Sequence, residues 1–204
     1  DPDLEPLRAD ARFGDWLERV RSRQRAESDR RALVLREGYW NEAFTLEPND
    51  GSPADDAWPR VSVSLQATEG SLQLAATVRD RRFLDRRQPW QNGDGLRVTI
   101  AFPPPAGDAR ESDHAFGFGF GLQGAMPVGA LVEQDGHARP VTVLELAPKI
   151  RLDDQRTEAT YAVTIPWTVL APYGPPVDTL LGLNVSYLSV GTDRVRRTAS
   201  WLPD

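Results

Sequence analysis

The segment from 61 to 78 reads VSVSLQATEGSLQLAATV. Apolar residues alternate with polar ones on both sides of Glu69-Gly70, which is the pattern of a β-hairpin with one buried face. Because successive side chains of a strand point to opposite faces, Val61, Val63 and Leu65 would share one face, and that face needs a covering layer. The hairpin therefore predicts a sheet that packs against a second sheet.

The same period of two returns along the chain between clusters of Gly, Pro, Asn and Asp. Its apolar members are Leu96, Val98, Ile100 and Phe102; Phe116, Phe118 and Phe120; Val141 and Val143; Tyr161, Val163 and Ile165; and Leu181, Leu183, Val185 and Tyr187. A last strand is expected from Val195 to Trp201, and one short helical turn near Thr168 to Leu170. We expect an all-β fold, an antiparallel jelly-roll-like β-sandwich of about eight or nine strands.

The pattern of apolar and charged residues in 1–37 differs from that of the strands and predicts an α-helical leader, which leaves 38–204 as the sandwich domain. An apolar helical stripe is formed at three- and four-residue spacing by Phe13, Trp16, Leu17 and Val20. Charged residues dominate from Arg19 to Arg31, which we interpret as a solvated helix face. The alternative is a juxtamembrane helix whose arginines face lipid headgroups. The chain opens at Asp1 without a signal peptide, so we expect a mature form or an excised fragment.

The composition argues against several classes of protein. The 204 residues include 24 Lys and Arg against 30 Asp and Glu, and the resulting net charge of −6 disfavours a nucleic-acid clamp. The absence of cysteine excludes disulfide scaffolds, thiol nucleophiles and thiolate metal sites. No apolar run approaches the roughly 20 residues that cross a bilayer. Because no nucleophile elbow, HExxH helix or phosphate-binding loop is found, we expect a non-catalytic domain and not an enzyme.

Three stretches together resemble the family 9 carbohydrate-binding modules and the wider group of DOMON-like sandwich domains. They are Leu74 to Asp80 followed by WQNGDGLRV at 90–98, then YAVTIPW at 161–167, and last LGLNV at 181–185 with Ser200-Trp201 after it. Their order and spacing correspond to the family over residues 38 to 204. The resemblance implies a jelly-roll-like sandwich that binds saccharides.

Trp90 is the first candidate for a ligand contact. It lies in a polar loop outside the alternating apolar stripes, and an exposed indole can stack on the C–H face of a sugar ring. The resemblance implies the same role, because a Trp at this place stacks on the sugar in the family. We expect polar contacts to the saccharide from Gln91, Asn92, Asp94 and Arg97. The alternative is an indole folded onto the rim of the sandwich.

The stretch FGFGFG at 116–121 indicates that another surface comes close to its glycine face. Glycine weakens the interior of a strand, so three glycines on one face favour a close approach there. That surface could be the N-terminal helix, a neighbouring strand or a planar ligand. We favour the helix.

A planar ligand would be haem, and this is the alternative function. The sandwich also resembles the haem b-binding cytochrome domains of the DOMON and ethylbenzene-dehydrogenase type, which implies iron ligation by Met with His or Lys. Side chains of those types are Met126, Lys149, His114 and His137. Otherwise we expect no cofactor, with a structural calcium ion as an option at the turn-like pairs Asp55-Asp56 and Asp153-Asp154.

The expected setting is extracytoplasmic, either periplasmic or secreted, with a saccharide as ligand and no nucleic-acid partner. Helix plus sandwich also resembles the sensory ectodomains that precede the membrane span of some histidine kinases. That resemblance implies a signal-transduction sensor with a membrane tether through the parent protein. A protein-interaction module without a small ligand, whose partner would be another protein, remains a further alternative.

Overall fold

The computed structural model describes residues 37–51, 58–84, 86–102, 114–143, 146, 148–171, 182–190 and 194–201. The chain divides into two compact units, Asp1–Val34 and Leu35–Asp204. The expected helical leader, with its lipid-facing alternative, and the pair Asp55-Asp56 lie outside the described residues. In the part that is described, no helix has the length and apolar character to cross a membrane.

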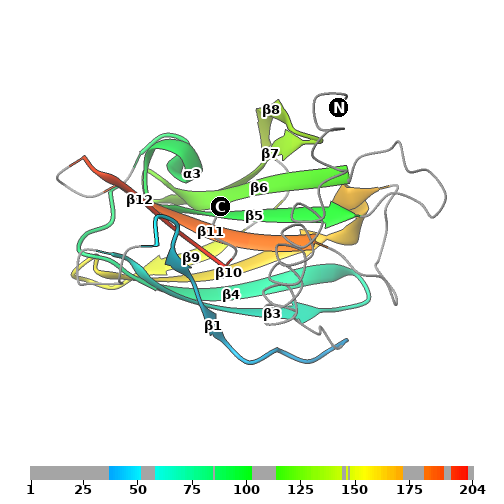
Figure 1. Ribbon diagram of the computed structural model, residues 1–204, viewed down its shortest axis with the longest axis horizontal. Helices are drawn as coiled ribbons and strands as arrows, with labels where there is room; N and C mark the ends of the chain where they lie inside the picture. The colour runs from blue at the N-terminus through cyan, green and yellow to red at the C-terminus, as the bar shows by residue number, and fades with distance from the viewer. Residues whose placement is uncertain are drawn as a thin grey trace, which may run out of the picture. The chain divides into compact units, whose positions relative to one another are not determined.

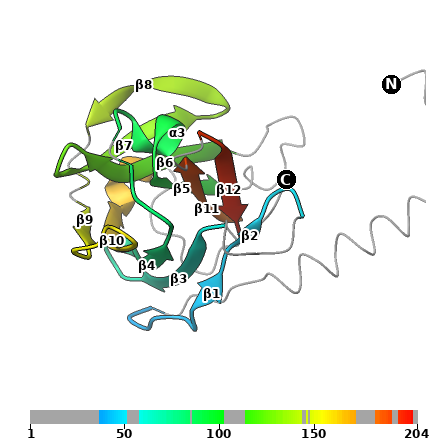
Figure 2. The same cartoon turned by 90° about the vertical axis from the view of Figure 1, so that its left-hand side faces the viewer.

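Two antiparallel sheets lie face to face in the second unit (Figures 1 and 2). The five-stranded sheet has the order β1-β3-β4-β10-β9, and the seven-stranded sheet has the order β2-β12-β11-β5-β6-β7-β8. Strands of the first sheet are β1 (Phe44–Thr45), β3 (Arg60–Ala67), β4 (Ser71–Arg79), β9 (Lys149–Leu152) and β10 (Glu158–Pro166). Strands of the second are β2 (Glu47–Pro48), β5 (Gly95–Phe102), β6 (His114–Gln123), β7 (Met126–Gln134), β8 (His137–Val143), β11 (Gly182–Val190) and β12 (Arg196–Ser200). The predicted all-β sandwich is confirmed.

The hairpin that predicted the sandwich lies inside the five-stranded sheet. β3 and β4 pair in the register Val61↔Val78 and Leu65↔Leu74, and all four of these side chains are buried. β10 then pairs with the other side of β4. The predicted helical turn is the 3-10 helix η2 (Trp167–Leu170), which begins after Pro166 because proline cannot continue the hydrogen-bond ladder.

The core lies between the two sheets and is filled by the alternating residues. Phe116, Phe118 and Phe120 of β6 are each at most 2% exposed. Trp167 is buried, and its Nε1 donates to the carbonyl of Thr68 at 2.9 Å. Burial of apolar area on this scale is the main source of the domain's stability.

Four strands and one helix are missing from the sequence prediction. β1 and β2 have two residues each and β9 has four, which is too short for a period of two to be read. β7 contains Pro127 and Gly129, and its register shifts beside Leu131, so its alternation is interrupted. The prediction of a single helical turn after position 60 is wrong, because α3 (Pro89–Asn92) is a second one.

Candidate functional site

Trp90 does not stand exposed in a loop; it is 6% exposed, so the prediction of an open stacking surface is wrong. The ring lies on the outer face of β6, where a Cβ at Gly119 would overlap the indole and a Cβ at Gly121 would overlap Pro89. It packs with Ala130 and Val132 of β7. The rim-packed alternative is therefore the one observed.

This packing also explains the Phe/Gly alternation of β6. The phenylalanines fill the core, and the glycines form a slot on the opposite face. The surface that approaches the slot is α3, a four-residue element from the chain just before β5. The N-terminal helix that we favoured lies outside the described residues. The indole Nε1 of Trp90 is buried without a hydrogen-bond partner among the described residues, so packing and not hydrogen bonding holds the ring.

Arg97 lies on the same outer face, with its side chain over Gly117, the remaining glycine of the slot. Its guanidinium passes close to Gly117 and forms an ion pair with Glu133 of β7, so one side chain links β5, β6 and β7. The two side chains are 42% and 35% exposed. Arg97 is thus already occupied by a carboxylate within the sheet.

Asp94 is an anchor beneath the site and is only 4% exposed. Its carboxylate accepts the backbone N–H of Val190 at 2.8 Å and that of Leu84, so it ties the segment before α3 to the end of β11. Burial raises the pKa of Asp94 to about 6. The hydrogen bonds from the two N–H groups act in the opposite direction, but their effect is smaller than that of burial. Asp94 is therefore buried and bonded to the backbone of two other segments.

Gln91 and Asn92 are the exposed members of the predicted set. Both belong to α3, and their backbone N–H groups bond to the carbonyl of Gln88, 2.9 Å from Gln91 and 3.0 Å from Asn92. The side-chain oxygen of Asn92 accepts from Arg196 of β12 at 3.4 Å. The five predicted residues therefore lie at one end of the sandwich. Gln91 and Asn92 are exposed, Arg97 is half-buried, and Trp90 and Asp94 are buried.

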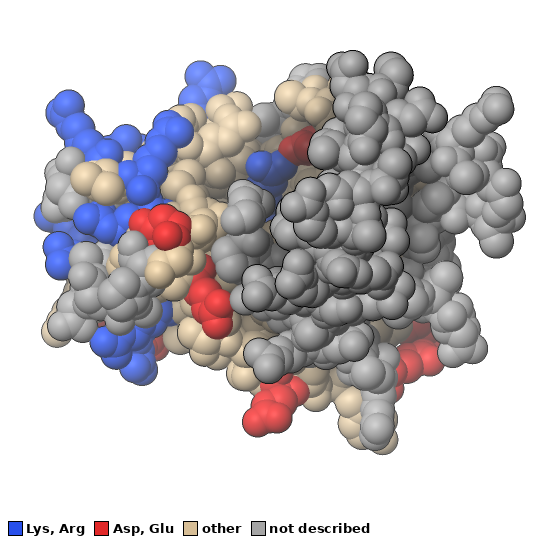
Figure 3. Space-filling model, viewed as in Figure 1, with Lys and Arg blue, Asp and Glu red and all other residues tan. Residues whose placement is uncertain are grey.

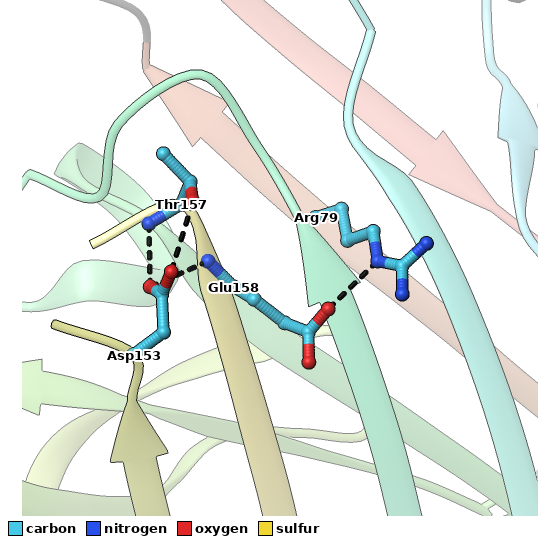
Figure 4. Close-up of polar contacts among 4 residues, drawn as sticks. All are labelled: Arg79, Asp153, Thr157 and Glu158. Carbon is cyan, nitrogen blue, oxygen red and sulfur yellow. Dashed lines mark hydrogen bonds and ion pairs between the residues drawn. The ribbon is translucent and has the colours of Figure 1, made fainter. Parts of the chain in front are cut away.

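A second group of polar side chains gathers at this end, where β4 ends and β10 begins (Figure 4). Arg79, Asp80, Asp153, Thr157 and Glu158 line an open depression of about 420 Å³. The Arg79 guanidinium pairs with Glu158 at 2.7 Å. Asp80 accepts from Ser189 at 2.6 Å and from the N–H of Arg81 at 2.7 Å.

Asp153 serves turn chemistry, as predicted. Its carboxylate accepts the N–H of Thr157 at 2.7 Å, the hydroxyl of Thr157 at 3.0 Å and the N–H of Glu158 at 2.8 Å. These bonds, the one from Glu158 first, lower the pKa of Asp153. Within the described residues no group of three acidic or histidine side chains could hold a metal ion.

The two parts are joined into one surface, which we call the α3 end: residues 79–84, 86–97, 153–158 and 194–196. The N–H of Phe83 bonds to the carbonyl of Arg156 at 3.0 Å, and the N–H of Asp80 bonds to the carbonyl of Thr157 at 2.9 Å. These backbone hydrogen bonds connect the segment between β4 and α3 to the turn between β9 and β10.

The candidate haem ligands are not brought together. Met126 opens β7 beside Gln123, whereas His114 opens β6 and His137 opens β8 at the other end of the same strands. Met126 is 68% exposed, and Lys149 belongs to the other sheet. An axial pair for iron needs two ligands on one pocket, so this arrangement does not favour haem.

Comparison with known proteins gives the fold an independent check. A family 9 carbohydrate-binding module from Caldicellulosiruptor kristjanssonii, solved with glucose, matches with a TM-score of 0.50 at 12% identity, over 83% of this chain and 81% of that one. The same module with cellotriose gives 0.48 at 12% identity over 83% and 80%. A proposed carbohydrate-binding protein from Bacteroides uniformis gives 0.48 at 18% identity over 80% and 78%. No family model and no curated protein matches the chain. The first comparison agrees with the expected sandwich at the level of the fold.

Sequence reasoning missed two features of the surface. The arginines on the segment from β4 to α3 were not considered, although RDRRFLDRR at 79–87 carries a visible run of them. Tyr39 and Trp40 are 72% and 48% exposed near the end of β3, where the N–H of Gly38 bonds to the carbonyl of Ala67 at 2.9 Å. They lie outside every alternating stripe, which was the signal available.

Proposed function

We propose that this chain is a non-catalytic saccharide-recognition domain and that it binds its ligand at the α3 end. The solved family 9 module with a matching fold binds glucose, which supports the ligand class. Recognition in a sandwich is a property of its rim and loops, because the inner faces are occupied by the core.

The observation that carries the proposal is the set of polar groups at this end. The amides of Gln91 and Asn92 are exposed on a short helix whose backbone is held by Gln88, at the end of the sandwich that also has a depression of about 420 Å³. Amides both donate and accept, so they suit sugar hydroxyls, which do the same. Trp90 then supports α3 from below by filling the glycine slot, in place of stacking on the sugar.

The test has two parts. The full chain is screened for binding to a panel of immobilised glycans, and it is titrated calorimetrically with soluble cellotriose and with any glycan found in the screen. We expect saturable binding to at least one glycan, and at least a tenfold loss of affinity in the double variant Gln91→Ala/Asn92→Ala. Glu69→Ala, in the exposed turn between β3 and β4 at the opposite end, is the matched control and should bind as wild type. Absence of binding to every glycan would overturn the proposal.

A finer proposal concerns the setting. We infer an extracytoplasmic location, and a sensory ectodomain is the context that the arginine-dense segment from Arg19 to Arg31 favours. Expression of the parent gene fused to alkaline phosphatase, which is active only outside the cytoplasm, tests the location. A fully inactive fusion with normal expression would contradict it.

A further inference from the structure

The α3 end carries a row of arginines that the sheet interior does not explain. Figure 3 shows Lys and Arg side chains gathered at the left of the view, where Figure 1 places α3 and the start of β12. The exposed arginines flanking α3 are Arg81, Arg82, Arg86 and Arg87 before it, with Arg194 and Arg196 beside it. This is a local excess of positive charge on a chain whose net charge is −6.

The segment that carries four of these arginines is fixed to the domain. Phe83 is 5% exposed, and its N–H bonds to the carbonyl of Arg156. The N–H of Leu84 bonds to buried Asp94. A Cβ at Gly93 would lie 3.0 Å from the Cβ of Arg86, so the stem of Arg86 rests on α3. Guanidinium groups on an anchored backbone lose less entropy on binding than those on a free loop.

Four carboxylates in the described part of this end are engaged inside the protein. Asp94 and Asp80 bond to β11 residues, Asp153 caps its own turn, and Glu158 pairs with Arg79. Their charge is therefore directed at internal N–H groups, the hydroxyls of Ser189 and Thr157, and one guanidinium. Arg82, Arg86, Arg87 and Arg196 are exposed beside α3 and can meet a ligand from solvent.

The chemistry of this surface selects a charged ligand. A guanidinium pairs with a carboxylate through two parallel N–H···O bonds, whereas the aromatic side chains of this end, Phe83 and Trp90, are buried and offer no ring face for stacking. Arg196 meets the amide of Asn92 at 3.4 Å, so donors for a carboxylate and groups for hydroxyls stand side by side. A sugar ring that carries one carboxylate and several hydroxyls meets both.

We propose that the saccharide recognised at the α3 end is a uronic-acid polysaccharide, with its carboxylates held by Arg82, Arg86, Arg87 and Arg196. This inference rests on the proposed saccharide-recognition function and narrows its substrate class. Binding is then electrostatic in part, and it weakens as salt rises because the groups are exposed.

The test titrates the full chain with oligogalacturonate and with alginate oligomers, each beside its methyl ester, which keeps the sugar backbone and removes the charge. We expect binding to at least one acid form and at least tenfold weaker binding to its ester. Arg86→Gln/Arg87→Gln should lower the affinity for the acid form at least tenfold. Lys149→Gln/Arg151→Gln removes the same charge from exposed positions of β9 and should change the affinity less than twofold.

The outcomes separate the two proposals. Binding of a neutral glycan alone, or equal binding of acid and ester, overturns the uronate inference and leaves saccharide recognition standing. Failure with every glycan overturns both. Tighter binding to sulfated glycans, single-stranded DNA or phosphatidylglycerol vesicles than to either uronate overturns the inference, because the surface would then respond to anionic charge alone. Thermal denaturation of each variant verifies the fold.

Discussion

At the scale of single residues, Gly119 and Trp90 form the contact on which the α3 end is built. The indole occupies the space that a side chain at Gly119 would fill, because a Cβ there would overlap the ring. A glycine in this position is therefore required by packing and not by backbone conformation.

Gly119→Ala should destabilise the domain by about 1–3 kcal/mol, because the new methyl group overlaps the indole and α3 must shift. Urea denaturation measures the change. Gly70→Ala is the control, since nothing lies within 4 Å of a Cβ there, and it should stay within about 1 kcal/mol of wild type. Equal stability of Gly119→Ala and wild type would mean that Trp90 does not occupy the slot.

Asp94 predicts a pH dependence of stability with a definite sign. Its pKa of about 6 in the folded protein exceeds the ordinary value of about 4 in an unfolded chain, so the folded state binds this proton more tightly. The stabilising contribution is complete below about pH 4 and is lost as pH rises through about 6. Relative to Asp94→Asn, which does not titrate, wild type should lose unfolding free energy between these values.

The measurement is the free energy of unfolding of both proteins in denaturant from pH 4 to pH 7. Asp153→Asn, measured from about pH 4 downward, provides a comparison of opposite sign, because a lowered pKa stabilises the folded state above the ordinary value of about 4 and that contribution is lost on further acidification. A difference between wild type and Asp94→Asn that stays constant across the range would contradict the assignment.

At the scale of elements, the hairpin β6–β7 shows what could and could not be predicted from the sequence. Strands with an unbroken period of two, such as β3, β4, β5 and β10, were predicted correctly because burial on one face imposes that period. β7 was missed because Pro127, Gly129 and a register shift break its pattern. A bulge is a property of pairing between strands and leaves little trace in one of them.

The segment that carries Trp90 lies at the surface as predicted, whereas the indole itself is buried and not exposed. Polar neighbours on both sides of Trp90 are typical of a surface loop, and α3 is indeed at the surface. The indole is buried because its receiving slot, at 117–121, lies about 30 residues further along the chain. Contacts between distant segments are the part of a site that local patterns leave undetermined.

The ion pair of Arg97 with Glu133 ties three strands and should add little to stability. Both side chains are about one-third or more exposed, so solvent screens them. A double-mutant cycle with Arg97→Gln and Glu133→Gln should give a coupling free energy below about 1 kcal/mol that decreases in 1 M salt. A coupling above about 2 kcal/mol, insensitive to salt, would indicate a pair that is shielded from solvent.

At the scale of the whole molecule, the sandwich separates stability from recognition. The two inner faces hold the apolar core, and the segments that join strand ends hold the charged and amide groups. Substitutions at exposed positions of the α3 end can therefore change binding while the fold persists, which makes the proposals testable one group at a time. The opposite case is the core, where removal of a buried phenylalanine costs about 3–5 kcal/mol.

The location of the ligand is the central claim, and amide chemical-shift mapping during titration with a bound glycan tests it most directly. We predict that the shifted resonances cluster at Gln91 and Asn92, in the turn from Asp153 to Glu158 and at Arg194 to Arg196. A cluster at Tyr39 and Trp40 beside β3, with the α3 end unchanged, would contradict the account.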